Sequence, residues 1–132
     1  MTSSFRAPDV IIGIGNPVRH DDGIGPAVVY HVADLHSSVA HLDLVVLDGE
    51  PTRVIEQWCG RRLAVVIDAV RAGSVPGTVH RLEVGVDSIP THDSAPSSHT
   101  TGLADAVALA TALDRLPSHL VLLGVEPSDV SL

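Results

Sequence analysis

The chain contains no lysine, and this absence excludes two kinds of chemistry. A P-loop needs a Gly-Lys pair followed by Ser or Thr, so the chain cannot cradle a nucleotide phosphate in that way. A Schiff base forms on a lysine amine, so this covalent route is also excluded. The other glycine motif for nucleotides, G-x-G-x-x-G, begins with Gly13 and Gly15 but has Val18 in place of the third glycine. Neither nucleotide-binding motif is therefore present.

Cysteines, aromatic residues and long apolar runs are also scarce. The single cysteine, Cys59, cannot form an internal disulfide, which favours a cytoplasmic location. Aromatic residues make up only 2% of the chain, too few for a platform that stacks bases or sugars. The net charge of −8 argues against binding nucleic acid or an anionic membrane. No apolar run approaches the roughly 18 residues of a membrane span, and no signal-peptide core is present. We expect one soluble domain over residues 1–132, with 45% hydrophobic residues to build its core.

The clearest local pattern begins with the β-branched run at 10–14, which is typical of a buried strand. A helix should follow, because apolar residues recur at spacings of three and four. Pro26 is tolerated only in a first helical turn, so this helix is predicted to begin between Asp22 and Gly25. The adjacent carboxylates Asp21 and Asp22 thus precede a helix, where an Asp-Asp pair is more often a cap than a functional site.

The rest of the chain alternates between apolar strands and helical stretches. Strands are expected at 42–47, 63–67, 78–84 and 120–125, with helices from a Thr52 cap to about Gly60 and over 101–116. This order predicts a three-layer α/β/α sandwich, with a mostly parallel, twisted five-stranded sheet and helices on both faces. The polar strand at 78–84 suits an edge. The sequence stops soon after the last strand, where such a domain normally has a further helix, so we expect either that the sequence is truncated there or that one face of the sheet is partly open.

Three aspartates are expected at one edge of this sheet. Asp22 follows the first strand, Asp48 ends the second and Asp68 ends the third, and ligands of such folds bind beyond the carboxyl ends of the strands. His99 closes the polar loop 85–99 and can reach the same edge. Carboxylates and an imidazole are suitable ligands for a divalent transition metal, with positions left open for water or a partner. The spacing alone is a weak signal, because no HExxH motif is present.

Other interpretations of these residues stay open. Asp22 and Asp68 could share a proton, as paired carboxylates do in aspartic proteases. His20 could be a further ligand or simply an exposed side chain. Cys59 is best interpreted as a packed structural thiol. No G-x-S-x-G elbow is present to support serine hydrolase chemistry.

Several stretches, taken together, resemble the hydrogenase maturation endopeptidases. They follow one another from about residue 9 to 127 as GIGNPVRHDDGIG, VVLDGEP, LAVVIDAV with PGTVHRLEV, SSHTTGLADAVALA and LVLLGVEP. The resemblance implies an α/β fold with a five-stranded twisted sheet. It also implies an aspartic-type endopeptidase that removes a short C-terminal peptide from the large subunit of [NiFe] hydrogenases after nickel has been inserted.

The resemblance assigns roles to individual residues. The metal-binding acid of the DDGxG loop falls on Asp22, the strand-end aspartate on Asp68 and the histidine of the SxH motif on His99. A DGG-type motif linked with cleavage falls on Asp48-Gly49, although Glu50-Pro51 follows it here. The family's C-terminal helix is expected to be absent from this chain.

The resulting interpretation is an endopeptidase that recognises nickel held in its substrate, the precursor of a [NiFe] hydrogenase large subunit. Catalytic roles fall on Asp22, Asp48 and Asp68, and Asp22, Asp68 and His99 would complete the coordination of the nickel. Zinc or cadmium could substitute for nickel. Two alternatives stay open: a self-contained metal-dependent hydrolase, and a non-catalytic metal-dependent binding module or pseudoenzyme. Neither nucleic acid nor a membrane is expected as a partner.

Overall fold

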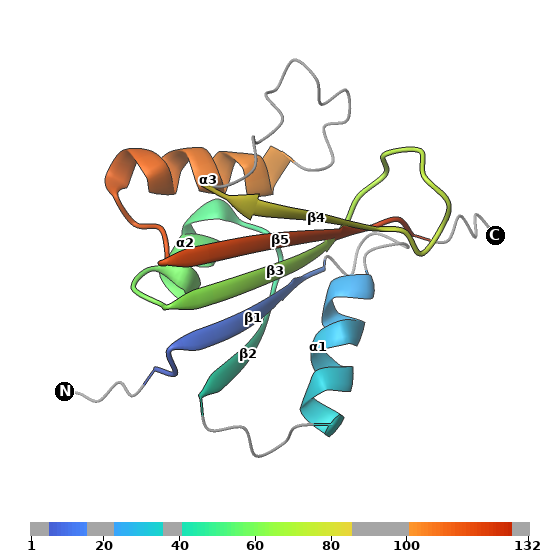
Figure 1. The fold of residues 1–132 in the computed structure, drawn as a ribbon, viewed down its shortest axis with the longest axis horizontal. Helices are drawn as coiled ribbons and strands as arrows, with labels where there is room; N and C mark the ends of the chain where they lie inside the picture. Colours follow the sequence, from blue (N-terminus) through green and yellow to red (C-terminus); the bar gives the residue numbers. More distant parts are fainter. Residues whose placement is uncertain (1–5, 16–22, 36–40, 86–100, 128–132) are drawn as a thin grey trace.

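The computed structural model describes residues 6–15, 23–35, 41–85 and 101–127, and the eight predicted elements all lie within them (Figure 1). In chain order they are β1 (Asp9–Ile14), α1 (Ile24–Leu35), β2 (Leu42–Leu47), α2 (Pro51–Trp58), β3 (Leu63–Ala69), β4 (Val79–Val84), α3 (Thr101–Leu113) and β5 (His119–Val125). Their number, type and order match the sequence prediction.

The strands form one sheet in the order β2-β1-β3-β5-β4. The pairs β1–β2, β1–β3 and β3–β5 are parallel, and β4 pairs antiparallel with β5 at the edge. Helix α1 packs on one face of the sheet, and α2 and α3 lie together on the other (Figure 1). The predicted α/β/α sandwich with a mostly parallel five-stranded sheet is confirmed. Among the described helices, none is both long and apolar enough to cross a membrane.

The main core lies between the sheet and the α2–α3 layer. Alternate residues of neighbouring strands point to this side, and those of β1 and β3 are fully buried: Val10, Ile12, Ala64 and Val66. Trp58 of α2 is also fully buried, and its indole N–H donates to the Arg115 carbonyl at 3.1 Å. Burying a large apolar side chain stabilises by about 1.5–3 kcal/mol, so this side carries much of the fold's stability.

On the opposite face, α1 begins in direct backbone contact with the sheet. A Cβ on Gly13 of β1 would lie 2.4 Å from the Gly25 carbonyl oxygen, and a Cβ on Gly25 would lie 2.4 Å from the Ile14 carbonyl oxygen and 2.7 Å from that of Ile67. Only glycines permit this approach. The first turn of α1 is thereby fixed against the carboxyl ends of β1 and β3.

At the other end of the sheet, Arg61 binds three separate segments. Its side chain is only 3% exposed, and it donates to the Asp43 carboxylate, to the Ala7 carbonyl at 2.7 Å and to the Gln57 carbonyl at 2.8 Å. The hydrogen bond from Arg61, opposed by the effect of burial, holds the pKa of Asp43 below its ordinary value.

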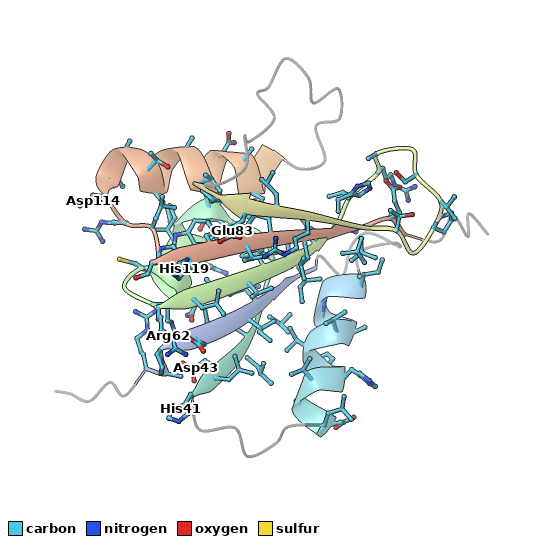
Figure 2. The ribbon with its side chains drawn as sticks, viewed as in Figure 1. His41, Asp43, Arg62, Glu83, Asp114 and His119 are labelled. Atoms are coloured by element: carbon cyan, nitrogen blue, oxygen red, sulfur yellow. The ribbon has the colours of Figure 1, made fainter. Side chains whose placement is uncertain are left out.

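Two further arginines surround this contact, and we call Arg6, Arg61 and Arg62 the amino-end cluster. Arg62 pairs through two nitrogens with the Asp9 carboxylate, at 3.0 and 2.7 Å. Arg6 donates to the carbonyls of Glu56 and Gln57 at the end of α2, at 2.7 and 2.6 Å. Figure 2 shows Asp43 and Arg62 together at this end of the sheet. The cluster therefore fixes the amino ends of the parallel strands. The site was predicted at the opposite side of the sheet, beyond their carboxyl ends.

Two helix boundaries differ from the prediction. Thr52 does not cap α2: Pro51 is the first helical residue, and the side chain of Glu50 is the cap, accepting from the Arg53 N–H at 3.1 Å. Helix α3 ends at Leu113, not at 116, because Asp114 adopts a left-handed conformation with φ 57°. The Arg115 N–H then donates back to the Ala110 carbonyl at 2.8 Å, which closes the helix end.

Candidate functional site

Two of the predicted site residues, Asp48 and Asp68, lie in the described structure. Asp21, Asp22 and His99, with His20, lie outside the described residues. The structure therefore places one member of the predicted metal set and the aspartate assigned to cleavage.

Asp68 is the last but one residue of β3, and its side chain is half-buried. It shares a face with Ala64 and Val66, and so points to the α2–α3 side. One carboxylate oxygen accepts from the Ala69 N–H at 2.8 Å. The neighbouring position on β5 is Gly124, and the Val70 side chain fills the space over it, since a Cβ on Gly124 would lie 2.7 Å from Val70 Cγ2.

Asp48 comes directly after β2, and its side chain is 51% exposed. Its Oδ1 accepts from the Glu50 N–H at 3.1 Å, and its Oδ2 lies 3.8 Å from Arg53 Nη1. Gly49, with φ 94°, makes the turn between the strand and α2. These contacts orient the Asp48 carboxylate toward the first turn of α2 while leaving it accessible to solvent.

The sheet register fixes the separation of the two aspartates. Ile14 of β1 is level with Leu47, and Gly13 is level with Ile67, so Asp48 and Asp68 lie within one residue of the same level on either side of β1. Two strand spacings amount to about 10 Å between the backbones. Asp48 and Asp68 thus lie at the same, carboxyl ends of their strands, but their carboxylates do not form a directly hydrogen-bonded pair.

A third carboxylate at this edge, Glu126, had no predicted role. It follows β5 and is only 5% exposed. Its Oε2 accepts from the Ala72 N–H at 2.6 Å and lies 3.3 Å from His80 Nε2. Burial raises the pKa of Glu126, but hydrogen bonds from the backbone of Ala72 and Ser74 and from His80 outweigh it, so the pKa stays below its ordinary value.

Glu126 also binds the segment 70–78, which contains Ala72, through its own backbone. Its carbonyl accepts from the Gly77 N–H, and its N–H donates to the Thr78 carbonyl, both at 2.9 Å. The segment 70–78, which leaves the sheet directly after Asp68, is therefore fixed at both of its ends and in its middle. The available signal for Glu126 was its position: like Asp48 and Asp68, it is an acidic residue at the end of an apolar strand.

Both helices that adjoin the undescribed site residues begin near this edge. The carbonyl of Gly23, which follows Asp22, accepts a hydrogen bond from the Ala27 N–H at 2.9 Å, at the start of α1. Figure 1 shows α1 and α3 beginning on the side toward which β1, β3 and β5 run. Within the described ranges no group of three His, Cys, Asp or Glu side chains could hold a metal ion. The set of Asp22, Asp68 and His99 stays a prediction, and Asp68 is the one member that lies within the described residues.

Comparison with known sequences gives consistent matches. The profile of a family described as hydrogenase maturation protease matches residues 29–132, a range that includes Asp48, Asp68 and His99 but not Asp22. The hydrogenase expression/formation protein HupD of Bradyrhizobium diazoefficiens is 33% identical over 134 residues, covering 98% of this chain and 67% of the relative. HupD of Thiocapsa roseopersicina is 33% identical over 125 residues, covering 92% of this chain and 55% of the relative. The chain thus spans between about half and two thirds of the length of these relatives.

Solved structures show the same fold. The hydrogenase maturating endopeptidase HybD from E. coli superposes with a TM-score of 0.63 at 22% identity, covering 91% of this chain and 74% of that one. The solution structure of an endopeptidase from Escherichia coli gives a TM-score of 0.68 at 21% identity, covering 92% and 75%. At these identities the likeness establishes the architecture alone.

Proposed function

This chain belongs to the hydrogenase maturation protease family, and on that premise we propose that it is an endopeptidase of hydrogenase maturation. Its substrate is the precursor of a [NiFe] hydrogenase large subunit, from which it removes the C-terminal extension after nickel insertion. It acts in the cytoplasm. The observation that carries the proposal is the family match over residues 29–132, which spans three of the four predicted site residues.

Asp22, Asp68 and His99 are the residues that contact the nickel carried by the substrate. The support from the structure is the position of Asp68: a half-buried carboxylate at the carboxyl end of β3, the central strand of the sheet. Two carboxylates and one imidazole form an incomplete coordination shell, which binds metal weakly alone and more tightly once substrate ligands join it. Zinc or cadmium could occupy the same ligands.

Asp48 acts separately from this set. Its carboxylate is exposed, oriented by the Glu50 N–H and about two strand spacings from Asp68. A peptide bond held between the two aspartates would have Asp48 available for proton transfer with the scissile bond or its attacking water. This arrangement supports an aspartic-type catalytic role for Asp48 and does not require Asp48 and Asp68 to share a proton.

Recognition of nickel has a thermodynamic reason. A precursor without nickel would lose the coordination energy contributed by these residues, so it would bind less tightly and escape cleavage. Removal of the extension would therefore follow metal insertion and not precede it.

The test mixes metal-stripped chain with nickel-free and nickel-containing precursor and follows loss of the C-terminal peptide by mass spectrometry. We expect cleavage of the nickel-containing precursor alone, and its loss in Asp68→Asn. The control is Asp105→Asn, which removes an exposed carboxylate from α3. Equal cleavage of both precursors, or cleavage of unrelated peptides, would favour the self-contained hydrolase. Binding of the nickel-containing precursor without cleavage would favour the non-catalytic module.

A further inference from the structure

Strand β4 forms one edge of the sheet, and within the described residues it pairs with β5 alone. An edge strand presents backbone N–H and C=O groups that can pair with another strand. Its sequence, VHRLEV, has one charge of each sign, on Arg81 and Glu83. These residues are two apart and lie on the same face, with Arg81 Nη2 3.4 Å from Glu83 Oε1. Figure 2 shows Glu83 on this part of the sheet.

The ladder with β5 determines which backbone groups of β4 point outward. The Glu126 N–H donates to the Thr78 carbonyl at 2.9 Å, and the Glu126 carbonyl accepts from Gly77, so residue 126 directs both of its backbone groups toward β4 and its partner Thr78 directs its carbonyl toward β5. Hydrogen-bonded and non-hydrogen-bonded pairs alternate along an antiparallel ladder. The N–H and C=O groups of residues 80, 82 and 84 therefore point toward β5. Those of residues 79, 81 and 83 point outward, away from the sheet.

We propose that two copies of this chain associate through their β4 strands, which pair antiparallel about a two-fold axis at Leu82. In such a dimer the residues whose backbone groups point outward (79, 81 and 83) must lie opposite one another. Three registers of the two β4 strands near the middle of the strand meet this condition. Two of them place Arg81 opposite Arg81, or Glu83 opposite Glu83, and like charges directly opposite are destabilising. The third places Arg81 of each copy opposite Glu83 of the other, forming two favourable pairs at once.

The strand is accessible for this contact. The Arg81 side chain is 58% exposed and Val79 is 55% exposed. In the favoured register the two Leu82 residues face each other at the axis as a non-hydrogen-bonded pair, the closer of the two pair types. The result is an isologous dimer, the commonest symmetry of soluble oligomers, in which two five-stranded sheets become continuous. The inference does not depend on the proposed function.

Charge reversal tests the register. Light scattering over a concentration series should give a dimer for the unaltered chain. Glu83→Arg and Arg81→Glu should each weaken association roughly tenfold or more, because each places like charges opposite. The double variant Arg81→Glu/Glu83→Arg should restore the dimer, and the control Asp105→Arg on α3 should leave it unchanged. Circular dichroism checks folding, and if Glu83→Arg does not fold, the more exposed Arg81→Glu decides.

A disulfide tests the axis. In a Cys59→Ser background, Leu82→Cys should form covalent dimers on oxidation, because the two positions face each other at a distance that suits a disulfide. Val79→Cys should not, since in this register the two Val79 residues are six positions, or about 20 Å, apart along the strands. A monomer at every concentration, a double variant that stays monomeric, or equal cross-linking at both positions would overturn the proposal. The first of these results would also be expected if the edge instead accepts an extended peptide of another protein.

Discussion

Gly13 and Gly25 meet backbone to backbone where α1 begins on β1. The Gly25 carbonyl oxygen occupies a position only 2.4 Å from where a Cβ of residue 13 would be. The residue before Gly23 is Asp22, so this contact sets the point from which the predicted ligand loop joins the helix. A glycine-rich loop after a strand often binds a nucleotide phosphate. Here the glycines instead allow the helix to pack closely on the strand.

Replacing either glycine by alanine should destabilise the chain. The added methyl group meets backbone atoms, which cannot rotate away, so we expect Gly13→Ala and Gly25→Ala each to cost about 2 kcal/mol or more. Gly23→Ala is the matched control: nothing lies within 4 Å of its Cβ position, and its effect should stay within about 0.5 kcal/mol. Urea unfolding followed by the fluorescence of Trp58, the single tryptophan, measures all three. Equal losses at Gly13 and Gly23 would contradict the packing explanation.

The amino-end cluster predicts unequal effects of two neighbouring arginines. Arg61→Met removes donors from the Asp43 carboxylate and two backbone carbonyls. It should cost about 2 kcal/mol, less than the roughly 3–5 kcal/mol for a fully buried pair, because the Asp43 side chain is 39% exposed. Arg62→Met breaks a pair whose arginine is 65% exposed, and should cost less than about 1 kcal/mol. The same unfolding measurement compares them. A larger loss at Arg62 would show that the buried contacts of Arg61 are not the stabilising ones.

Acid should weaken the fold through Glu126 and Asp43. The pKa of each is lower in the folded chain than its ordinary value, so the charged form favours folding. Their contribution is present above the unfolded pKa, about 4, and is lost as the pH falls through the folded values. Glu126→Gln should therefore lower stability at pH 7 and reduce its fall between pH 5 and 3. Unfolding curves at these pH values test this, with the exposed Glu56→Gln as control. An unchanged pH dependence in Glu126→Gln would exclude the carboxylate as a source.

The predicted metal ligands can be tested without the hydrogenase. Asp22→Asn, Asp68→Asn and His99→Ala should each weaken nickel binding by at least the order of tenfold, measured by calorimetric titration. Circular dichroism should show an unchanged fold, and Asp105→Asn should bind as the unaltered chain does. A residue whose replacement leaves the affinity unchanged is not a ligand.

The fold could be predicted where a local pattern decides the structure. The apolar run at 42–47 is β2 with the same bounds, and Pro26 placed the start of α1 correctly because proline is restricted to a first turn. The cap of α2 was assigned wrongly to Thr52, since threonine is a common cap and glutamate is not. The same proline rule favours Glu50, because Pro51 follows it and takes the first helical position.

The site was less predictable, because its contacts join residues far apart in the sequence. Asp48 and Asp68 were identified from strand ends, which is a local signal. Glu126 ends a strand in the same way, but its partners Ala72 and His80 are 54 and 46 residues away, and neither their distance nor their orientation is visible in the sequence. The contact of Gly13 with Gly25 was hidden for the same reason.

The strand order also has a consequence for the sequence of events during synthesis. Among the five described strands β5 is synthesised last, yet it lies between β3 and β4. The pairs of β1 with β2 and β3 can form early, whereas β4 has no partner in the sheet until β5 inserts beside it. Until then β4 is an unpaired strand, the kind of segment on which nascent chains misassociate. Release of β5 is therefore the step at which these five strands become one continuous sheet.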